Sequence, residues 1–166
     1  MPAPPRSLAS DDRLRHEVAA LLQGRQAHVD ARAALGGVPA DRVGDRAGGE
    51  HSLWELLWHL RFTQADILEF VRSPGYRTKD WPADYWPDRP APPHGSEWEA
   101  TRQAFLADLD ALVALAETGD LFAELDHAPG YTLLRELLLA ADHAAYHLGQ
   151  VVALRRRLGL WPPDEP

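Results

Sequence analysis

The chain has 166 residues, 45% of them hydrophobic, which suits one domain with a single core and excludes global disorder. It has no cysteine, which excludes disulfides, thiolate metal ligands and a cysteine nucleophile. Its formal net charge is −8, supplied by residues 84–166, and an acidic chain repels a phosphate backbone, so no nucleic-acid partner is expected.

The start of the sequence shows no sign of a signal peptide, because MPAPPRS carries one charge and no apolar run. No stretch approaches the ~18–20 consecutive apolar residues of a membrane span. We therefore expect a cytoplasmic protein without a membrane partner, formed by one domain over residues 1–166.

The first helix is predicted to begin near Ser10, where two aspartates fall in the electropositive first turn. Apolar residues follow at helical spacing. Gly24 weakens this helix, and a second helical piece is expected over residues 26–35. A glycine-rich loop over residues 36–50 follows.

The second main helix has a sharp predicted start, because Ser52 and Glu55 form a capping-box sequence in front of an apolar run. It should continue to about Arg72. The next segment, residues 73–95, contains six prolines and cannot form a regular helix.

A second capping-box sequence, Ser96 and Glu99, predicts the start of the third main helix, which should end near Thr118. The fourth is expected over residues 132–158, with Gly159 just beyond its end and three arginines, 155–157, complementing its dipole. No strand and no internal repeat is predicted.

The proline-rich segment is long enough to return along a whole helix, since extended chain covers roughly 3.3 Å per residue. We therefore expect an all-α, up-down-down-up four-helix bundle with a crossover between its second and third helices. Trp81, Tyr85 and Trp86 either pin this crossover to the bundle or line a substrate mouth, and the segment is also a candidate lid.

His143 and His147 are the most informative histidines. Residues four apart lie on the same helix face, at a spacing that lets two imidazoles bind one ion. Apolar residues on this face indicate that it points inward. The alternative is a pair of partly exposed surface histidines.

A third ligand is expected from His59, in the middle of an apolar helix. It lies roughly 12 Å from the start of its helix, while His143 and His147 lie roughly 16–22 Å from the end of theirs. If these two helices are antiparallel, the three side chains come to similar levels. Three neutral imidazoles suit zinc or nickel and leave a coordination position open, although a lone histidine there can also be a core residue.

Three further residues are candidates for catalysis beside such a metal. Glu55 is a possible base, but its capping box is an alternative role. Gln150 and Tyr146 flank the histidine pair and can bond a substrate or a ligand, while Tyr146 also suits a core or interface. Asp66 and Glu136 lie seven residues from the predicted ligands and are compatible with a role in the fold alone.

The remaining histidines carry weaker indications. His28 can face the site from the first helix or lie on the surface, and His51 suits a local turn before the second main helix. His16, His94 and His127 fall in surface or loop contexts and are assigned no function.

The sequence Ser52-Leu53-Trp54-Glu55-Leu56-Leu57-Trp58-His59-Leu60-Arg61, followed by His143-xxx-His147-Leu148-Gly149-Gln150, resembles the DinB-like superfamily. This resemblance covers nearly the whole chain. It implies an up-down-down-up bundle, often a dimer, with a metal held by His59, His143 and His147. Some members are thiol S-transferases that use bacillithiol, and relatives include mycothiol-dependent isomerases.

We therefore expect a metal-dependent transferase that joins a low-molecular-weight thiol to a small electrophile. One alternative is a metal-dependent hydrolase, although Ala144 stands where the HExxH motif has its glutamate base. Another is a non-enzymatic, stress-related protein in which the metal is structural. A homodimer is expected, with Trp54, Trp98 and Trp161 as a possible seam, although tryptophans also fill cores.

Overall fold

The computed structural model describes residues 8–49 and 51–162, with no side chains described for residues 8–10. This part is mainly helical, as the sequence predicts, and adds one small sheet. In chain order the elements are α1 (Leu8–Gln23), α2 (Ala31–Leu35), α3 (Leu53–Arg72), the 3-10 helix η1 (Ala83–Tyr85), α4 (Gly95–Thr118), β1 (Glu124–Leu125), β2 (Ala128–Thr132) and α5 (Leu133–Arg157).

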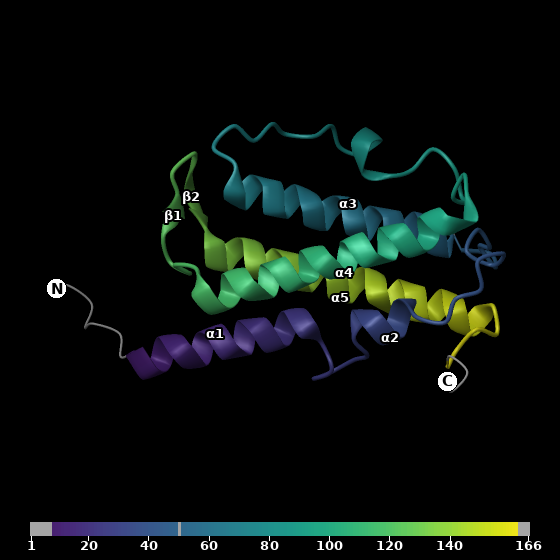
Figure 1. The fold of residues 1–166 in the computed structure, drawn as a ribbon, viewed down its shortest axis with the longest axis horizontal. Coiled ribbons are helices and arrows are strands. Elements are labelled where there is room, and N and C mark those ends of the chain that lie inside the picture. Colours follow the sequence, from purple (N-terminus) through teal and green to yellow (C-terminus); the bar gives the residue numbers. More distant parts are fainter. Residues whose placement is uncertain (1–7, 50, 163–166) are drawn as a thin grey trace.

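The four long helices lie side by side (Figure 1). α3 packs against α4 and α5, and α1 packs against the same two helices. Figure 1 shows α3 and α4 starting at one end of the molecule, and α1 and α5 starting at the other. The crossover, residues 73–94, therefore returns along the outer side of α3 before α4 begins.

The start of α3 is fixed by the predicted capping box. The Ser52 hydroxyl accepts from the Glu55 backbone N–H at 3.1 Å, and the Glu55 carboxylate accepts from the Ser52 N–H at 2.7 Å. Arg46 binds the same carboxylate, with Nη2 2.5 Å from Oε1. These bonds satisfy donors that a helix start leaves unpaired, so they fix where His59 falls in the bundle.

Both ends of α5 also match the prediction. The Thr132 side chain caps the start by accepting from the Arg135 N–H at 3.2 Å. At the other end Gly159 has a φ of 72°, and its N–H donates to the Arg156 carbonyl at 3.2 Å. The next N–H, of Leu160, donates to Arg155, which completes a Schellman motif.

The capping box predicted at Ser96 is wrong. α4 begins at Gly95, its N-cap is His94, and no side chain caps it. Glu99 binds Arg102 instead, with Oε1 2.6 Å from Nη2. The helix begins as soon as the prolines of the crossover end, so Ser96 already lies inside the first turn.

The β1–β2 hairpin between α4 and α5 is an element that the sequence prediction misses. Its strands pair antiparallel with an irregular register. Most of β2 is exposed and it includes Pro129 and Gly130, so neither alternation nor composition marks it as a strand. The turn between the strands contacts the neighbouring helix: the His127 ring binds the Phe70 carbonyl of α3 at 2.8 Å.

The N-terminal region differs from the prediction in its boundaries. α1 begins at Leu8 rather than Ser10, and α2 begins at Ala31 rather than at residue 26. Gly24 and Arg25 both have positive φ and break the helix, and Asp30 caps α2 by accepting from a backbone N–H.

Arg155, which the sequence places with the cations of a helix end, is fully buried instead. Its guanidinium donates to the Ala34 carbonyl at 2.7 Å and to the Leu160 carbonyl at 3.1 Å. It therefore satisfies carbonyls at the end of α2 and joins α5 to that helix.

The crossover is fastened along α3 at several points. The Tyr85 hydroxyl donates to Asp66 Oδ2 at 2.7 Å, and Lys79 Nζ donates to Glu69 Oε2 at 2.9 Å. Near α4, the Ser52 hydroxyl donates to the Pro90 carbonyl at 2.5 Å. Helix side chains thus hold a segment that has little regular hydrogen bonding of its own.

Two of the three tryptophans considered for a dimer seam belong to the core of the chain itself. Trp54 is 4% exposed and Trp98 is 5% exposed. Only Trp161 is partly exposed, and its ring faces the Arg155 guanidinium at 5.1 Å. Within the described residues, no helix has both the length and the apolar character needed to cross a membrane.

Candidate metal centre

His59 lies two turns into α3, on a stretch that is apolar and buried. Leu57 and Leu60 beside it are fully buried, and the His59 side chain itself is only 1% exposed. An imidazole in such surroundings needs polar partners, because burying an unpaired polar group costs free energy. The partners come from α5 and from the crossover.

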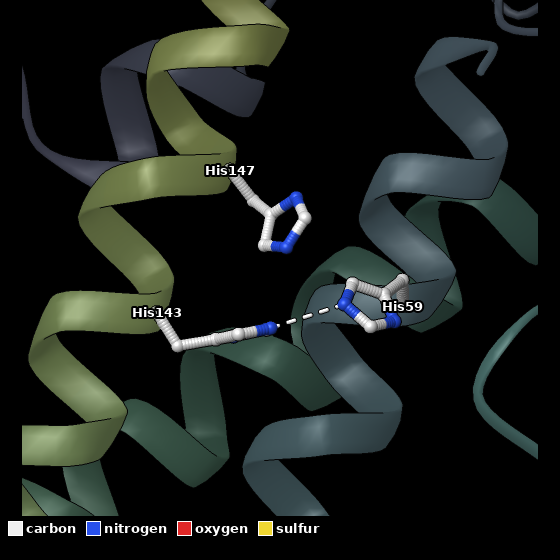
Figure 2. A group of neighbouring side chains, drawn as sticks. All are labelled: His59, His143 and His147. Atoms are coloured by element: carbon white, nitrogen blue, oxygen red, sulfur yellow. Dashed lines mark hydrogen bonds between the residues drawn. The ribbon is translucent and has the colours of Figure 1, made fainter. Parts of the chain in front are cut away.

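His143 and His147 lie one turn apart on α5 and point toward His59 (Figure 2). One ring nitrogen from each histidine lies within 4.8 Å of the other two. Among them, His59 Nε2 and His143 Nε2 lie 3.0 Å apart. The structure thus brings the three predicted ligands together from two helices.

Two neighbours orient these rings through their Nδ1 atoms. His59 Nδ1 lies 2.8 Å from the Tyr85 carbonyl oxygen, and His147 Nδ1 lies 2.8 Å from Gln150 Oε1. Both oxygens can only accept, so each Nδ1 carries the hydrogen and each Nε2 keeps a free lone pair. Metal-ligating histidines are commonly held in this way.

The geometry suits a divalent metal ion. Two nitrogens bound to one ion at about 2.0–2.1 Å, with tetrahedral or smaller angles, lie roughly 3 Å apart, as His59 Nε2 and His143 Nε2 do here. Without a proton or a cation between them, two facing lone pairs would repel each other. The three histidines can therefore hold a metal ion, and an all-imidazole donor set is compatible with zinc and nickel.

Burial keeps the three rings neutral at physiological pH. Burial, with a smaller contribution from the neighbouring histidines, lowers the pKa of His59 to about 4 and that of His143 to about 3. The pKa of His147 is also lowered, chiefly by burial. Because a metal needs the unprotonated imidazole, few protons compete for these nitrogens at neutral pH.

A stack of three rings supports His59 on its other side. The Trp86 ring lies between His59, at a centroid distance of 4.1 Å, and His51, at 3.9 Å, and is nearly parallel to both. Trp86 thus fixes the plane of the His59 ring, and His51 closes the stack. The sequence predicts only a local turn role for His51, because its partner Trp86 is distant in the chain.

Tyr85 and Asp66 form the second support from the crossover. The Tyr85 carbonyl holds the His59 ring, while the Tyr85 hydroxyl binds Asp66, which follows His59 by about two turns of α3. Burial and the Asp66 carboxylate raise the pKa of Tyr85. Of the three crossover aromatics, Tyr85 and Trp86 therefore pin the segment, whereas Trp81 is 69% exposed, with its ring centroid 6.5 Å from that of His59.

The structure gives the three candidate catalytic residues different positions. Glu55 is used by its capping box and by Arg46; although burial raises its pKa, the hydrogen bonds from Arg46 and Ser52 prevail and lower it. Gln150 orients His147. Tyr146 is 65% exposed, and its ring edge contacts His147, so it lies at the rim of the site.

The other residues considered lie outside the histidine cluster. Glu136 is buried and pairs with the adjacent Arg135. His28 is exposed and lines a groove on the outer side of α5, away from the ligands. His16 and His94 are also exposed.

These observations define a class: a helical protein in which two antiparallel helices, α3 and α5, present three neutral histidines suited to one metal ion. The family model described as the DinB superfamily matches residues 12–151, which is most of the chain. The protein therefore belongs to the DinB superfamily. Comparison with curated proteins and with solved structures finds no significant match.

Proposed function

We propose that the protein is a metal-dependent enzyme of the thiol S-transferase type, which joins a low-molecular-weight thiol to a small electrophile. The observation that carries this proposal is the convergence of three neutral imidazoles, with 3.0 Å between His59 Nε2 and His143 Nε2. A closed structural zinc site has about four protein ligands. Three histidines therefore leave one coordination position for a substrate. A zinc or nickel ion there supplies a Lewis acid that stabilises the thiolate form of the cosubstrate near neutral pH.

The chemical step needs little else from the chain. The thiol releases its proton to solvent, and its sulfur then forms a bond to the electrophilic carbon. The bond from that carbon to its leaving group breaks, and the leaving group departs with the electron pair. The exposed rings of Trp81 and Tyr146 provide apolar surface for the electrophile at the rim.

Two features favour thiol transfer over hydrolysis. A carboxylate base that takes a proton from water assists metal-dependent hydrolysis, and the described cluster consists of histidines with no carboxylate among them. Glu55, the sequence candidate for that base, is engaged by Ser52 and Arg46. The chain also has no cysteine, so a sulfur nucleophile has to arrive as a cosubstrate.

The proposal includes the finer architecture expected from the sequence, an up-down-down-up bundle of α1, α3, α4 and α5. The neighbour pairs among these helices and their directions in Figure 1 support it. In that arrangement α3 and α5 are antiparallel, which is what brings His59 to the level of the α5 pair.

Turnover with and without a thiol tests this function. Zinc- or nickel-loaded protein is given a chromogenic dinitrophenyl halide together with mercaptoethanol, and thioether formation is followed by absorbance. We expect thiol-dependent turnover that is lost in His143→Ala and retained in His16→Ala, a histidine control on exposed α1 surface. Absence of thioether formation with a panel of halides and epoxides, or equal consumption of the electrophile without thiol, would contradict the proposal.

A further inference from the structure

A hollow of about 200 Å³ lies beside the metal centre, between the start of α3 and the last turns of α5. Its apolar lining comes from Leu56, Ala153 and Leu154. Leu56 precedes His59 by about one helical turn, which is roughly 5 Å along the axis. The hollow therefore lies between the same two helices, α3 and α5, as the three histidines, and about one helical turn closer to the start of α3.

The hollow and the metal centre share two of their walls. Gln150 lines the hollow and binds the ring of His147 through its Oε1. His51 also lines the hollow, and through Trp86 it belongs to the stack that supports His59. A molecule in the hollow is thus in contact with groups that hold the ligands.

The charged group of the hollow is the guanidinium of Arg157. Its neighbours in the chain are used elsewhere: Arg155 is buried against carbonyls of α2, and Arg156 lines a different groove. Within the described residues Arg157 has no ion pair or hydrogen bond, and none of the described residues that line the hollow is acidic.

The remaining wall is backbone at Gly49. A Cβ added to Gly49 would lie 3.3 Å from Arg157 Nη2, so a side chain there would crowd the guanidinium. An arginine presents a planar fork that binds a carboxylate through two hydrogen bonds. His51 adds a ring nitrogen, Gln150 adds an amide, and the leucines and Ala153 suit a short hydrocarbon chain.

We propose that this hollow is a carboxylate-binding subsite of the metal centre, in which Arg157 and His51 hold the carboxylate of a small substrate whose reacting end lies at the three histidines. The substrate class is then a molecule with a carboxylate separated from its reacting group by a short apolar chain. This inference rests on the proposed function.

The test compares matched pairs of thiols on protein loaded with cobalt(II), whose sulfur-to-metal absorption reports thiol binding. Each pair has the same chain length and ends in a carboxylate or in a hydroxyl, such as mercaptopropionate and mercaptopropanol or mercaptobutyrate and mercaptobutanol. Dissociation constants are measured for the wild type, for Arg157→Gln, and for Arg156→Gln as the adjacent control.

For the best chain length we expect the carboxylate thiol to bind about 10-fold tighter than the alcohol, a typical value for one charge-assisted interaction. The preference should vanish in Arg157→Gln and remain in Arg156→Gln. Equal affinities within every pair in the wild type would overturn the subsite while leaving thiol binding at the metal intact. If neither member of any pair changes the spectrum, the proposed function itself fails, and the subsite with it.

Discussion

His59 and His147 show how single hydrogen bonds decide the chemistry of this site. Each Nδ1 faces an oxygen that can only accept, the Tyr85 carbonyl for His59 and the Gln150 amide for His147. The hydrogen is thereby kept on Nδ1, and both Nε2 lone pairs point to the same place. The neighbours of these two histidines thus select the tautomer that can bind a metal ion.

Gln150 can be tested as a positioning residue through metal affinity. In Gln150→Leu the His147 ring loses its acceptor, and we expect the affinity for zinc to fall by about 10–100-fold. Gln150→Glu keeps an acceptor and should recover most of the affinity. Competition with a chromophoric chelator measures both, with Gln103→Leu on exposed α4 surface as the control. Unchanged affinity in Gln150→Leu would show that the contact does not orient the ligand.

The lowered histidine pKa values make a prediction about the metal-free protein. An unfolded chain takes up protons at His59 and His143 below their usual pKa of 6.5, but the folded chain does so only near the lowered values of about 4 and about 3. The unfolded state therefore binds more protons over this range. The free energy of unfolding should be highest above pH 6.5 and fall as the pH drops, by up to about 1.4 kcal/mol per pH unit for each histidine.

Denaturant unfolding of the metal-free protein at a series of pH values checks this dependence. Other groups titrate in the same range, so the informative quantity is the difference between the wild type and His143→Ala. We expect a shallower fall in the variant, because one buried imidazole has been removed. Parallel curves for the two proteins would refute the assignment of the pH dependence to this histidine.

At the scale of residues, the sequence predicts the ligands but not their supports. His143 and His147 are recognisable from a four-residue spacing, and His59 from its depth in an apolar helix. His51 and Trp86 give no comparable signal, because a ring stack between a turn and a crossover depends on tertiary packing. The aromatic content of residues 81–86 marks the crossover as important without indicating which ring meets which histidine.

The two capping-box sequences offer a matched test at the scale of elements. Ser52 caps α3 and is buried, whereas Ser96 lies exposed within the first turn of α4 and caps nothing. Ser52→Ala should lower the free energy of unfolding by about 0.5–2 kcal/mol. Ser96→Ala should change it by less than about 0.5 kcal/mol. If Ser52→Ala lowers the free energy of unfolding as little as Ser96→Ala is expected to, the start of α3 does not depend on its cap.

The contact of Tyr85 with Asp66 makes the crossover testable as one element. Tyr85→Phe removes the hydroxyl and leaves the largely buried Asp66 carboxylate without this donor, with Lys79 Nζ 4.0 Å from its Oδ1. We expect the free energy of unfolding to fall by about 1–3 kcal/mol. Metal affinity should fall as well, because the bond from the hydroxyl to Asp66 fixes the position of the Tyr85 backbone carbonyl, which holds the His59 ring.

Tyr131→Phe is the control for this substitution, since Tyr131 is an exposed tyrosine of the hairpin. Chemical denaturation and chelator competition are measured on both variants. If Tyr85→Phe behaves like the control in both measurements, the crossover is held by other contacts, such as the Trp86 stack.

The elements that sequence analysis places well are those with strong local signals. Ser52, Thr132 and Gly159 mark helix ends by side-chain or backbone chemistry that acts within a few residues. The sequence does not predict the β1–β2 hairpin or the burial of Arg155, because both involve contacts with residues far along the chain, Phe70 for His127 and Ala34 for Arg155. Ser96 and Glu99 have the residue types and spacing of a capping box although Ser96 lies inside the first turn of α4, so the sequence pattern alone places the cap too late in the chain.

At the scale of the whole molecule, the order of the helices creates the site. The crossover returns along α3, so α4 starts at the same end as α3, and α5 then runs in the opposite direction (Figure 1). This arrangement brings His59 to the level of the α5 pair and lays Tyr85 and Trp86 over the outer side of α3. A segment without regular structure thereby becomes part of the ligand support.

The proposal that His59, His143 and His147 together hold a metal ion can be tested by measuring the metal content of each chain. Tag-free protein, together with His59→Ala, His143→Ala and the control His16→Ala, is incubated with zinc or nickel, desalted and analysed by plasma mass spectrometry. We expect one divalent ion per chain in the wild type and in the control, and its loss in both other variants. A wild-type chain that retains no metal after this incubation would contradict the proposal, and the three histidines would then be core residues.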